Sequence, residues 1–485
     1  MKDIENMDMT LNQPNVSQSS DQILLTEDTD VDPLLEQQWE EYQHSLVDEC
    51  TAKYMDPEWR ELDRKSSSND QIKYMIVNDL NNVSKMTVEE YTLYLKWCEI
   101  QEKYPGEIKR TLTGDHFVYD NPEHMKLIRK IKHNIWTPKN PDDFSEIEAL
   151  KPRLILCNAT DVGDSVTLDG TETKNVKNDP ELAKIWNCIR TFISTMKNSS
   201  NIGRNLRYLV VDETSGKYLG VICISSDFMD LTPRDKYIGW DRELKTKKMI
   251  NHTAIGSTIV PFQPLGYNAV GGKLLALLCL SNTVREDWER LYGDKLAGVT
   301  TTSLYGKNKV GGMSQYDGLK HWKKMGFSAG SVAFECRKIT IKAMTTWLEK
   351  NYPRKYFEWY VATKPSGQPY KRDHRNRSFT FIYNKLDIPK DIQRTDHARG
   401  IYFSELYENT NEYLRGEIDE SKLVVKVDGS YEYLTKLWLD KYARKRYKSL
   451  KSQNREFMTD FLFYDDLSWK DWFTAKDDYL GQVGR

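Results

Sequence analysis

Residues 253–280 read TAIGSTIVPFQPLGYNAVGGKLLALLCL and predict a strand, a turn and a helix in immediate succession. The strand is predicted over Thr253–Pro261, the turn over Gln263–Asn268 and the helix over Ala269–Leu280. Free backbone N–H groups and the dipole at the start of such a helix favour a phosphate or a carboxylate. This turn is therefore the best candidate in the chain for a cofactor site.

The glycines around the turn leave two readings open. A nucleoside triphosphate P-loop is improbable, because Tyr267 and Leu274 stand where that motif requires Gly and Ser or Thr. One reading is that the turn binds an anion of another kind. The other is that three glycines let the helix pack closely on a sheet; they are Gly266, Gly271 and Gly272.

The flanking sequence predicts an α/β domain around this unit. Leu206–Val211 and Tyr218–Ser225 predict a hairpin, because two apolar, β-branched runs enclose a polar turn. After the helix, Ala297–Tyr305 predicts a strand, Gln315–Met325 a helix and Phe327–Phe334 an extended segment. The order β-β-β-α-β-α-β indicates a mixed sheet with helices packed on it.

The outer parts of the chain differ in charge. Residues 1–50 contain thirteen acidic side chains and one basic one, although the whole chain of 485 residues has a formal net charge of −2. The remaining residues therefore carry a net charge near +10, which is typical of proteins that meet polyanions. The predicted segments are an acidic, largely disordered leader over 1–50, a helical region over 51–205, the α/β domain over 206–345 and a basic, aromatic region over 346–485.

Some classes of protein and site are excluded. The longest dense apolar run, Leu274–Leu280, is far shorter than the roughly 20 residues that span a bilayer, so no membrane segment is expected. No secretory signal is recognisable, so we expect a cytoplasmic protein. The seven cysteines contain no C-x-x-C pair, and the histidines form no local cluster, so no metal site is predicted.

The strand, turn and helix, followed by Val299–Tyr305 and the segment Gly318–Phe327, resemble the GNAT acyltransferase superfamily in order and spacing. The segments Tyr237–Trp240, Trp288–Gly293 and Ser314–Lys320 more closely resemble the GNAT-like domain of the Druantia anti-phage system protein A family. That family has members in tailed phages, which implies the cytoplasm of the host cell. A looser similarity connects the region with the Mom DNA-modification proteins.

This resemblance implies a GNAT-like fold over 206–345 and an acyl-CoA cofactor. The superfamily's pyrophosphate loop falls on Gln263, Gly266 and Asn268, and Gly271 and Gly272 would line the same site. The tyrosine that often protonates the leaving thiolate is replaced by Trp322, which cannot supply that proton. Other side chains are therefore candidates for the reacting centre, although each has a structural alternative; they are Tyr305, Tyr316, Asp317 and His321.

The last third of the chain contains two basic segments with interleaved aromatic residues, the first over 353–377 and the second over 436–455. Such a mixture suits contact with phosphates and stacking on bases. In the second segment, Leu434, Leu437, Trp438 and Tyr442 predict an apolar face, so that one side of a helix docks while the other meets a polyanion. The alternative is a solvated basic surface. The candidate nucleic-acid-binding residues are Lys371, Arg372, Arg375, Arg377, Arg444, Lys445 and Arg446.

Two classes of function follow. The first is a phage-type, acyltransferase-like enzyme or DNA base-modifying protein that acts on nucleic acid. The second is a non-catalytic protein with a GNAT-like scaffold, which binds nucleic acid, takes part in virion assembly or belongs to a defence or counter-defence complex with protein partners. An enzyme of this kind needs an open split beside Thr253–Pro261, whereas a binding protein can fill that split with side chains.

Overall fold

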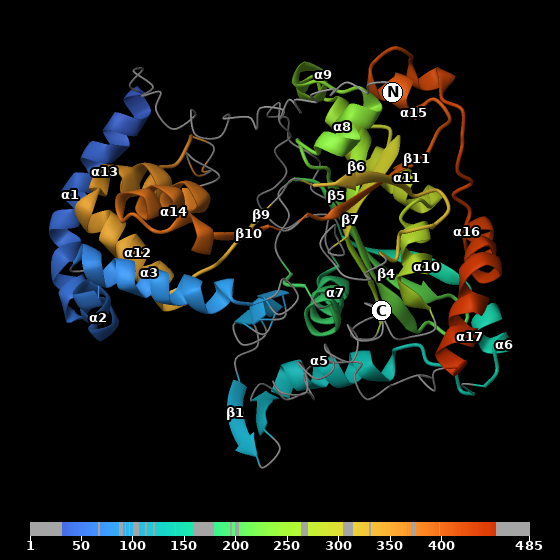
Figure 1. Ribbon diagram of the computed structural model, residues 1–485, viewed down its shortest axis with the longest axis horizontal. Coiled ribbons are helices and arrows are strands. Elements are labelled where there is room, and N and C mark those ends of the chain that lie inside the picture. The colour runs from blue at the N-terminus through green and yellow to red at the C-terminus, as the bar shows by residue number, and fades with distance from the viewer. Residues whose placement is uncertain are drawn as a thin grey trace, which may run out of the picture. The chain divides into compact units, whose positions relative to one another are not determined.

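The structure is a computed structural model of the chain (Figure 1). It describes residues 32–452, except for 66–67, 87–90, 93, 97, 100–105, 112–113, 120–121, 141, 159–178, 195, 199–202, 263–269, 304–313, 329–330, 366, 368, 370–373 and 397. The chain divides into two compact units. The first comprises residues 1–81 and 335–393, and the second comprises residues 82–334 and 394–485.

The first unit is helical. On α3, Ile72, Ile76 and Leu80 follow one another at a spacing of four residues and are fully buried, so they form one continuous apolar face. The rings of Trp39 and Phe357 pack against each other at a tilt of 57°, with centroids 5.1 Å apart. Packing of the chain therefore begins on α1, inside the segment 1–50. The elements are α1 (Pro33–Met55), α2 (Pro57–Lys65), α3 (Asn69–Ser84), α12 (Lys338–Asn351), α13 (Pro353–Tyr356), η3 (Phe357–Val361), α14 (His374–Lys385) and η4 (Lys390–Ile392).

A buried carboxylate, Asp79, joins α3 to the start of α12. It accepts hydrogen bonds from Arg337 N at 2.9 Å, Arg337 Nε at 2.6 Å and Thr340 Oγ1 at 2.6 Å. The N-cap residue Arg337 provides no side-chain cap of its own. Asp79 therefore caps α12 from another helix, and it also neutralises a cation there.

We expect Asp79→Ala to lower the free energy of unfolding by about 2 to 3 kcal/mol, because it removes a cap and charged hydrogen bonds together. Urea unfolding followed by circular dichroism measures this. The matched control is Asp70→Ala, on the exposed surface of the same helix. Equal effects of the two substitutions would contradict the capping role.

The second unit is built on a mixed sheet. Among the described residues its strands lie in the order β3-β4-β5-β6-β7-β11-β8. Neighbouring strands are antiparallel except for β6 and β7, which are parallel. The bounds are β3 (Pro152–Asn158), β4 (Asn205–Asp212), β5 (Tyr218–Ser226), β6 (Thr253–Pro261), β7 (Gly298–Ser303), β8 (Lys323–Phe327) and β11 (Gly400–Glu405).

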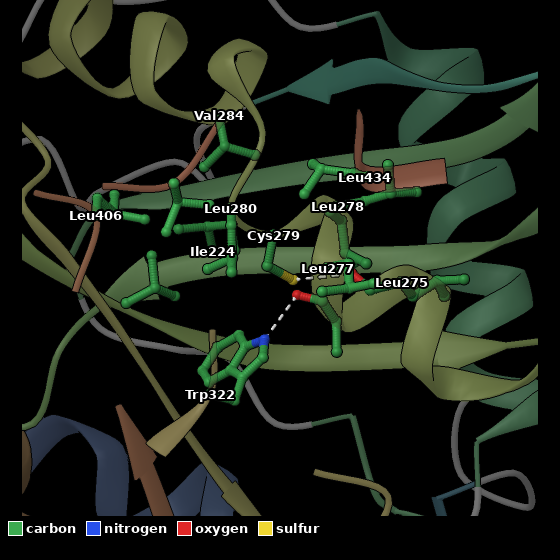
Figure 2. Close-up of a cluster of buried hydrophobic side chains, with 14 of the residues drawn as sticks. Ile224, Leu275, Leu277, Leu278, Cys279, Leu280, Val284, Trp322, Leu406 and Leu434 are labelled. Carbon is green, nitrogen blue, oxygen red and sulfur yellow. Dashed lines mark hydrogen bonds between the residues drawn. The ribbon is translucent and has the colours of Figure 1, made fainter. Parts of the chain in front are cut away.

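Helices cover both faces of this sheet, because side chains of alternate strand residues enter two separate apolar cores. On β4, Tyr208 enters one core and Leu209 the other. Figure 1 shows α5 (Pro122–His133) and α7 (Pro180–Ile193) on one face, and α10 (Gly271–Leu278) and α16 (Tyr431–Trp438) on the opposite face. Apart from Lys273, every residue of α10 is buried, because this helix lies between the sheet and α16 (Figure 2).

The remaining elements of the second unit connect or extend this sandwich. Two further strand pairs lie outside the large sheet, β1 (Gly106–Thr111) with β2 (Gly114–Tyr119), and β9 (Ser331–Ala333) with β10 (Arg394–Asp396). The other helices are α6 (Ser145–Glu148), α8 (Thr232–Ile238), α9 (Arg242–Thr246), η1 (Met249–His252), α11 (Asn282–Tyr292), α15 (Thr410–Leu414), η5 (Glu420–Lys422), η6 (Leu439–Ala443) and α17 (Arg444–Ser452). None of the helices in the described part of the chain is long and apolar enough to cross a bilayer.

Most predicted elements of the α/β region are confirmed, including the hairpin β4–β5, the strand β6 and the helix α10. The helix predicted over Gln315–Met325 is wrong. That segment forms turns and then enters strand β8, since two of its residues, Gly318 (φ 68°) and His321 (φ 74°), have positive φ angles that no right-handed helix accommodates. Gly326 (φ 130°), directly after the segment, also has a positive φ angle.

Candidate phosphate-binding site

The candidate site lies where the parallel strands β6 and β7 separate. They pair over only three residues each, Thr253–Ile255 with Gly298–Thr300. Beyond this point β6 continues beside β5 as far as Pro261, whereas β7 continues beside β11. The two strands therefore separate beside β6, at the place where an enzyme of the GNAT type would need an open split and a binding protein could fill it.

Side chains occupy the described part of this split. The buried hydroxyl of Thr301 donates a hydrogen bond to the Gly256 carbonyl across the gap, with an Oγ1 to O distance of 3.0 Å. Tyr316 is fully enclosed beside it, and burial raises the pKa of its hydroxyl to about 12. Gln315 lies directly against Gly272 at the start of α10. The amide of Gln315 therefore occupies the space that a side chain at position 272 would take.

Positive charges gather at the start of α10. Gly271 has a φ angle of 61°, and Arg446 Nε lies 3.1 Å from the position that a Cβ would take there. Lys273, in the first turn of α10, is half-buried, and its ammonium lies 4.8 Å from the centre of the Tyr442 ring. Burial lowers the pKa of Lys273, and the charges of Arg446 and Lys445 lower it further, against the opposing effect of a nearby carboxylate. A cluster of like charges of this kind is suited to a bound anion.

That carboxylate is Asp317. It accepts hydrogen bonds from the Tyr402 hydroxyl at 2.7 Å, the Lys324 ammonium at 3.2 Å and the Ser314 amide at 3.0 Å. Burial tends to raise the pKa of Asp317, but the hydrogen bonds from Tyr402 and Lys324 hold it below its usual value. Asp317 is therefore an ionised group at the edge of the cationic cluster.

The remaining predicted residues of the reacting centre, and Trp322 in place of the usual tyrosine, have different surroundings. Trp322 is buried, and its indole N–H donates to the Ala276 carbonyl on α10 at 3.2 Å (Figure 2). The half-buried His321 shares a hydrogen bond between Nε2 and the Tyr433 hydroxyl at 2.9 Å. Tyr305 lies outside the described residues, as do the predicted cofactor residues Gln263, Gly266 and Asn268.

The environment of His321 makes stability depend on pH. Burial lowers its pKa from 6.5 to about 4, and nearby cations contribute to the shift. The unfolded chain therefore takes up a proton between about pH 6.5 and pH 4 that the folded chain refuses, so stability falls as the pH drops through this interval. The cations are Lys320, Lys426, Lys441 and Arg285.

We expect His321→Gln to lose less stability than the parent protein when the pH is lowered from about 7 to about 5. Glutamine keeps a polar partner for Tyr433 but does not titrate in this range. Urea unfolding at both pH values measures the difference. An identical pH dependence in the two proteins would show that His321 does not contribute to it.

The predicted nucleic-acid-binding residues are divided between the two units. Lys371 and Arg372 lie outside the described residues. In the helical unit, Arg375 pairs with Glu335 at 3.4 Å, and Arg377 is exposed on the same helix, α14. In the sheet unit, Arg444, Lys445 and Arg446 all lie at the start of α17.

The basic residues of η6 and α17 fall into distinct sets. Arg444 and Lys451 form ion pairs with Glu148 and Asp142. Arg446 faces Gly271. A third set is exposed and has no ionic partner among the described residues. This lysine row consists of Lys441, Lys445 and Lys448.

Sequence reasoning missed several contributors to the site. Lys273, Gln315 and Tyr402 are not among the site residues that the sequence predicts. Lys273 had a signal, because it is the basic residue in the first turn of a helix that follows glycines. Tyr402 had none, since it reaches Asp317 from β11, 85 residues further along the chain.

Comparison with known proteins gives two matches. A protein-family model described as Druantia protein DruA matches residues 147–416, which is more than half of the chain. A curated protein of Escherichia coli (strain UMEA 4076-1), described as Druantia protein DruA, is 28% identical over 242 residues. That alignment covers 47% of this chain and 57% of the relative, so the chain spans little more than half the length of this relative. No solved structure matches the chain.

Proposed function

The chain belongs to the Druantia protein DruA family, and from this premise we propose that it is an anti-phage defence component that binds nucleic acid through α17. The proposed partner is DNA, held by contacts between lysine ammonium groups and backbone phosphates. As a member of a defence system, the protein would also meet protein partners. The described residues support the binding role better than they support a particular reaction.

The observation that carries this proposal is the exposed lysine row. In the same helix Arg444 and Lys451 are neutralised by acidic side chains, whereas Lys441, Lys445 and Lys448 are not. Keeping several like charges close together and exposed costs electrostatic free energy, which a polyanion recovers on binding. Lys273 and Arg446 add positive charge beside the start of the same helix.

The test is a titration of labelled DNA with the full chain, followed by fluorescence anisotropy at several salt concentrations. We expect the logarithm of the affinity to fall linearly with the logarithm of the salt concentration between about 50 and 200 mM, because binding releases counterions. A labelled RNA of the same length compares the two nucleic acids. Absence of binding at about 50 mM salt would overturn the proposal.

A GNAT-like fold that uses acyl-CoA is the second candidate. The separation of β6 from β7 supports the fold, whereas the hydrogen bond from Thr301 to Gly256 across the gap counts against an open channel in the described part of the split. The residues at the start of α10 fit a pyrophosphate, since Lys273 and Arg446 gather charge beside Gly271. In this candidate these two side chains would hold the pyrophosphate, and the backbone of β6 beyond Gly256 would hold the pantetheine arm. The bound cofactor would supply an acyl thioester for transfer.

Calorimetric titration with CoA and acetyl-CoA tests this candidate. We expect saturable binding that weakens at least about tenfold in Lys273→Met, which removes the charge but keeps an unbranched apolar side chain. Lys236→Met, on an exposed surface of α8, is the matched control. Absence of binding at about 1 mM ligand would exclude acyl-CoA and leave the nucleic-acid proposal intact.

A further inference from the structure

The lysine row would face the protein interior if α16, η6 and α17 formed one regular α-helix. In an α-helix, residues three, four and seven positions apart lie on the same face. Lys441 follows the buried Leu437 by four residues and the buried Trp438 by three, and Lys445 follows Trp438 by seven. Lys448 comes three residues after Lys445. Uninterrupted α-helical geometry would thus place all three ammonium groups against the apolar core.

The structure avoids this with a π-helical turn. Residues Leu439–Ala443 form η6, which joins α16 to α17, and Figure 1 shows the two helices following one another along the same side of the unit. A π-turn contains one residue more than an α-turn, so the residues after it are displaced by one position around the helix. The buried residues after the turn are accordingly Ala443 and Leu450, with Arg446 and Tyr447 partly buried.

Contacts on the inner side hold the displaced helix in place. The Tyr442 hydroxyl accepts a hydrogen bond from the Lys320 amide at 2.8 Å and donates one to the Gly318 carbonyl at 3.2 Å. Further along, the Tyr447 ring packs on the Phe144 ring, with centroids 5.0 Å apart. These contacts fix which face of α17 is turned outward.

We propose that the π-turn Leu439–Ala443 builds the nucleic-acid surface, by turning the lysine row outward and Arg446 inward, and that this surface binds without regard to base sequence. The inference rests on the proposed function. Apart from lysines, the exposed residues of α17 are Arg444, which is already paired, Ser449 and Ser452. This face offers ammonium groups for phosphates and, among its exposed described residues, no asparagine, glutamine or acidic side chain for the edges of adenine or cytosine.

Chemical labelling of the full chain tests the geometry without reference to binding. An amine-acylating reagent should modify Lys445 and Lys448 at the rate of other exposed lysines such as Lys236, while a dicarbonyl reagent should modify Arg446 slowly. Peptide mass spectrometry measures both rates. Protected lysines together with a rapidly modified Arg446 would overturn the inference.

Two chain-length variants test the consequence for binding. Deleting Asp440, an exposed residue of the π-turn, should convert the turn to regular α-helix and leave Lys445 and Lys448 outward. DNA affinity should then stay within about threefold of that of Asp440→Asn, which removes the same charge and keeps the turn. Inserting one alanine after Asp440 should instead rotate α17 by about 100° and weaken binding at least tenfold.

These experiments separate the two proposals. If the parent protein binds no DNA, the proposed function fails, while the labelling pattern still decides the geometry. If the parent binds DNA but deletion of Asp440 abolishes binding in a protein with unchanged helicity, the π-turn inference fails alone. Affinities that differ more than tenfold between DNA sequences of equal length would overturn the sequence-independent part. If the insertion variant does not fold, labelling and the deletion decide.

Discussion

Replacing Lys441, Lys445 and Lys448 together with glutamine is expected to weaken DNA binding by about 10- to 100-fold at low salt. Each of these side chains is exposed and without an ionic partner in the described part of the chain. Their removal therefore leaves no buried charge behind and should not disturb the fold. Loss of the lysine row subtracts phosphate contacts, and nothing else in the helix replaces them.

The salt dependence gives this prediction its sharpest form. The slope of log affinity against log salt should become shallower by roughly 2 to 3, since each neutralised phosphate contributes about 0.9 on a DNA duplex. A control triple variant carries the same charge change at three lysines elsewhere in the unit, Lys217, Lys236 and Lys422. Anisotropy titrations of both variants measure affinity and slope. Equal losses in the two would mean that net charge alone, and not the lysine row, determines binding.

Arg234→Leu is expected to lower the free energy of unfolding by about 3 to 5 kcal/mol, because it leaves buried carboxylates without their cation. Arg234 is fully buried, with Nη1 2.8 Å from the equally buried Asp227 and Nη2 2.6 Å from Asp235. Its Nη2 also donates to the Phe228 carbonyl at 2.8 Å. The guanidinium thus satisfies the fully buried Asp227 and the mostly buried Asp235.

This cluster connects the end of β5 to the helices that follow it. Asp227 also accepts a hydrogen bond from Thr300 on β7 at 2.7 Å, and Asp235 accepts one from Lys245 on α9 at 2.9 Å. Loss of Arg234 should therefore destabilise the sheet unit as a whole. Urea unfolding measures the change, with Arg242→Leu at an exposed position as the control. A loss below about 1 kcal/mol would indicate that the carboxylates find other partners or become protonated.

Local patterns in the sequence were sufficient for much of the sheet unit. The run of β-branched residues in Thr253–Pro261, followed by glycines and an apolar helix, predicts β6 and α10, and both are present. The start of α7 is also set by close neighbours, because Asp179 accepts hydrogen bonds from the amides of Glu181 and Leu182 and Pro180 occupies the first helical position. These elements depend on contacts between close neighbours in the chain, which periodicity and capping residues encode.

The helix predicted over Gln315–Met325 is wrong, because positive φ angles in this segment are incompatible with an α-helix. The apolar residues between Gln315 and Met325 fit a helical spacing, but glycines at 318 and 326 and His321 adopt positive φ angles. The resulting turn directs Asp317 toward Tyr402 and Lys324, which no helix over this segment could do. The sequence therefore predicts Asp317 as a site residue but does not predict the hydrogen bonds that it accepts from Tyr402 and Lys324.

The sequence by itself determined the strand β6, the helix α10 that follows it, the positive charge of α17 and the apolar face on which this last described helix docks. Only the tertiary structure decided that β11 enters the sheet between β7 and β8, because pairing between distant strands leaves no mark on local periodicity. It also decided which basic residues remain unneutralised, since the partners Glu148 and Asp142 lie some three hundred residues earlier in the chain. Finally, it decided which face of α17 meets the solvent. A π-turn displaces every later residue by one position, and packing of Tyr442, Tyr447 and Leu450 on the body selects that displacement over the regular helix that would bury three lysines.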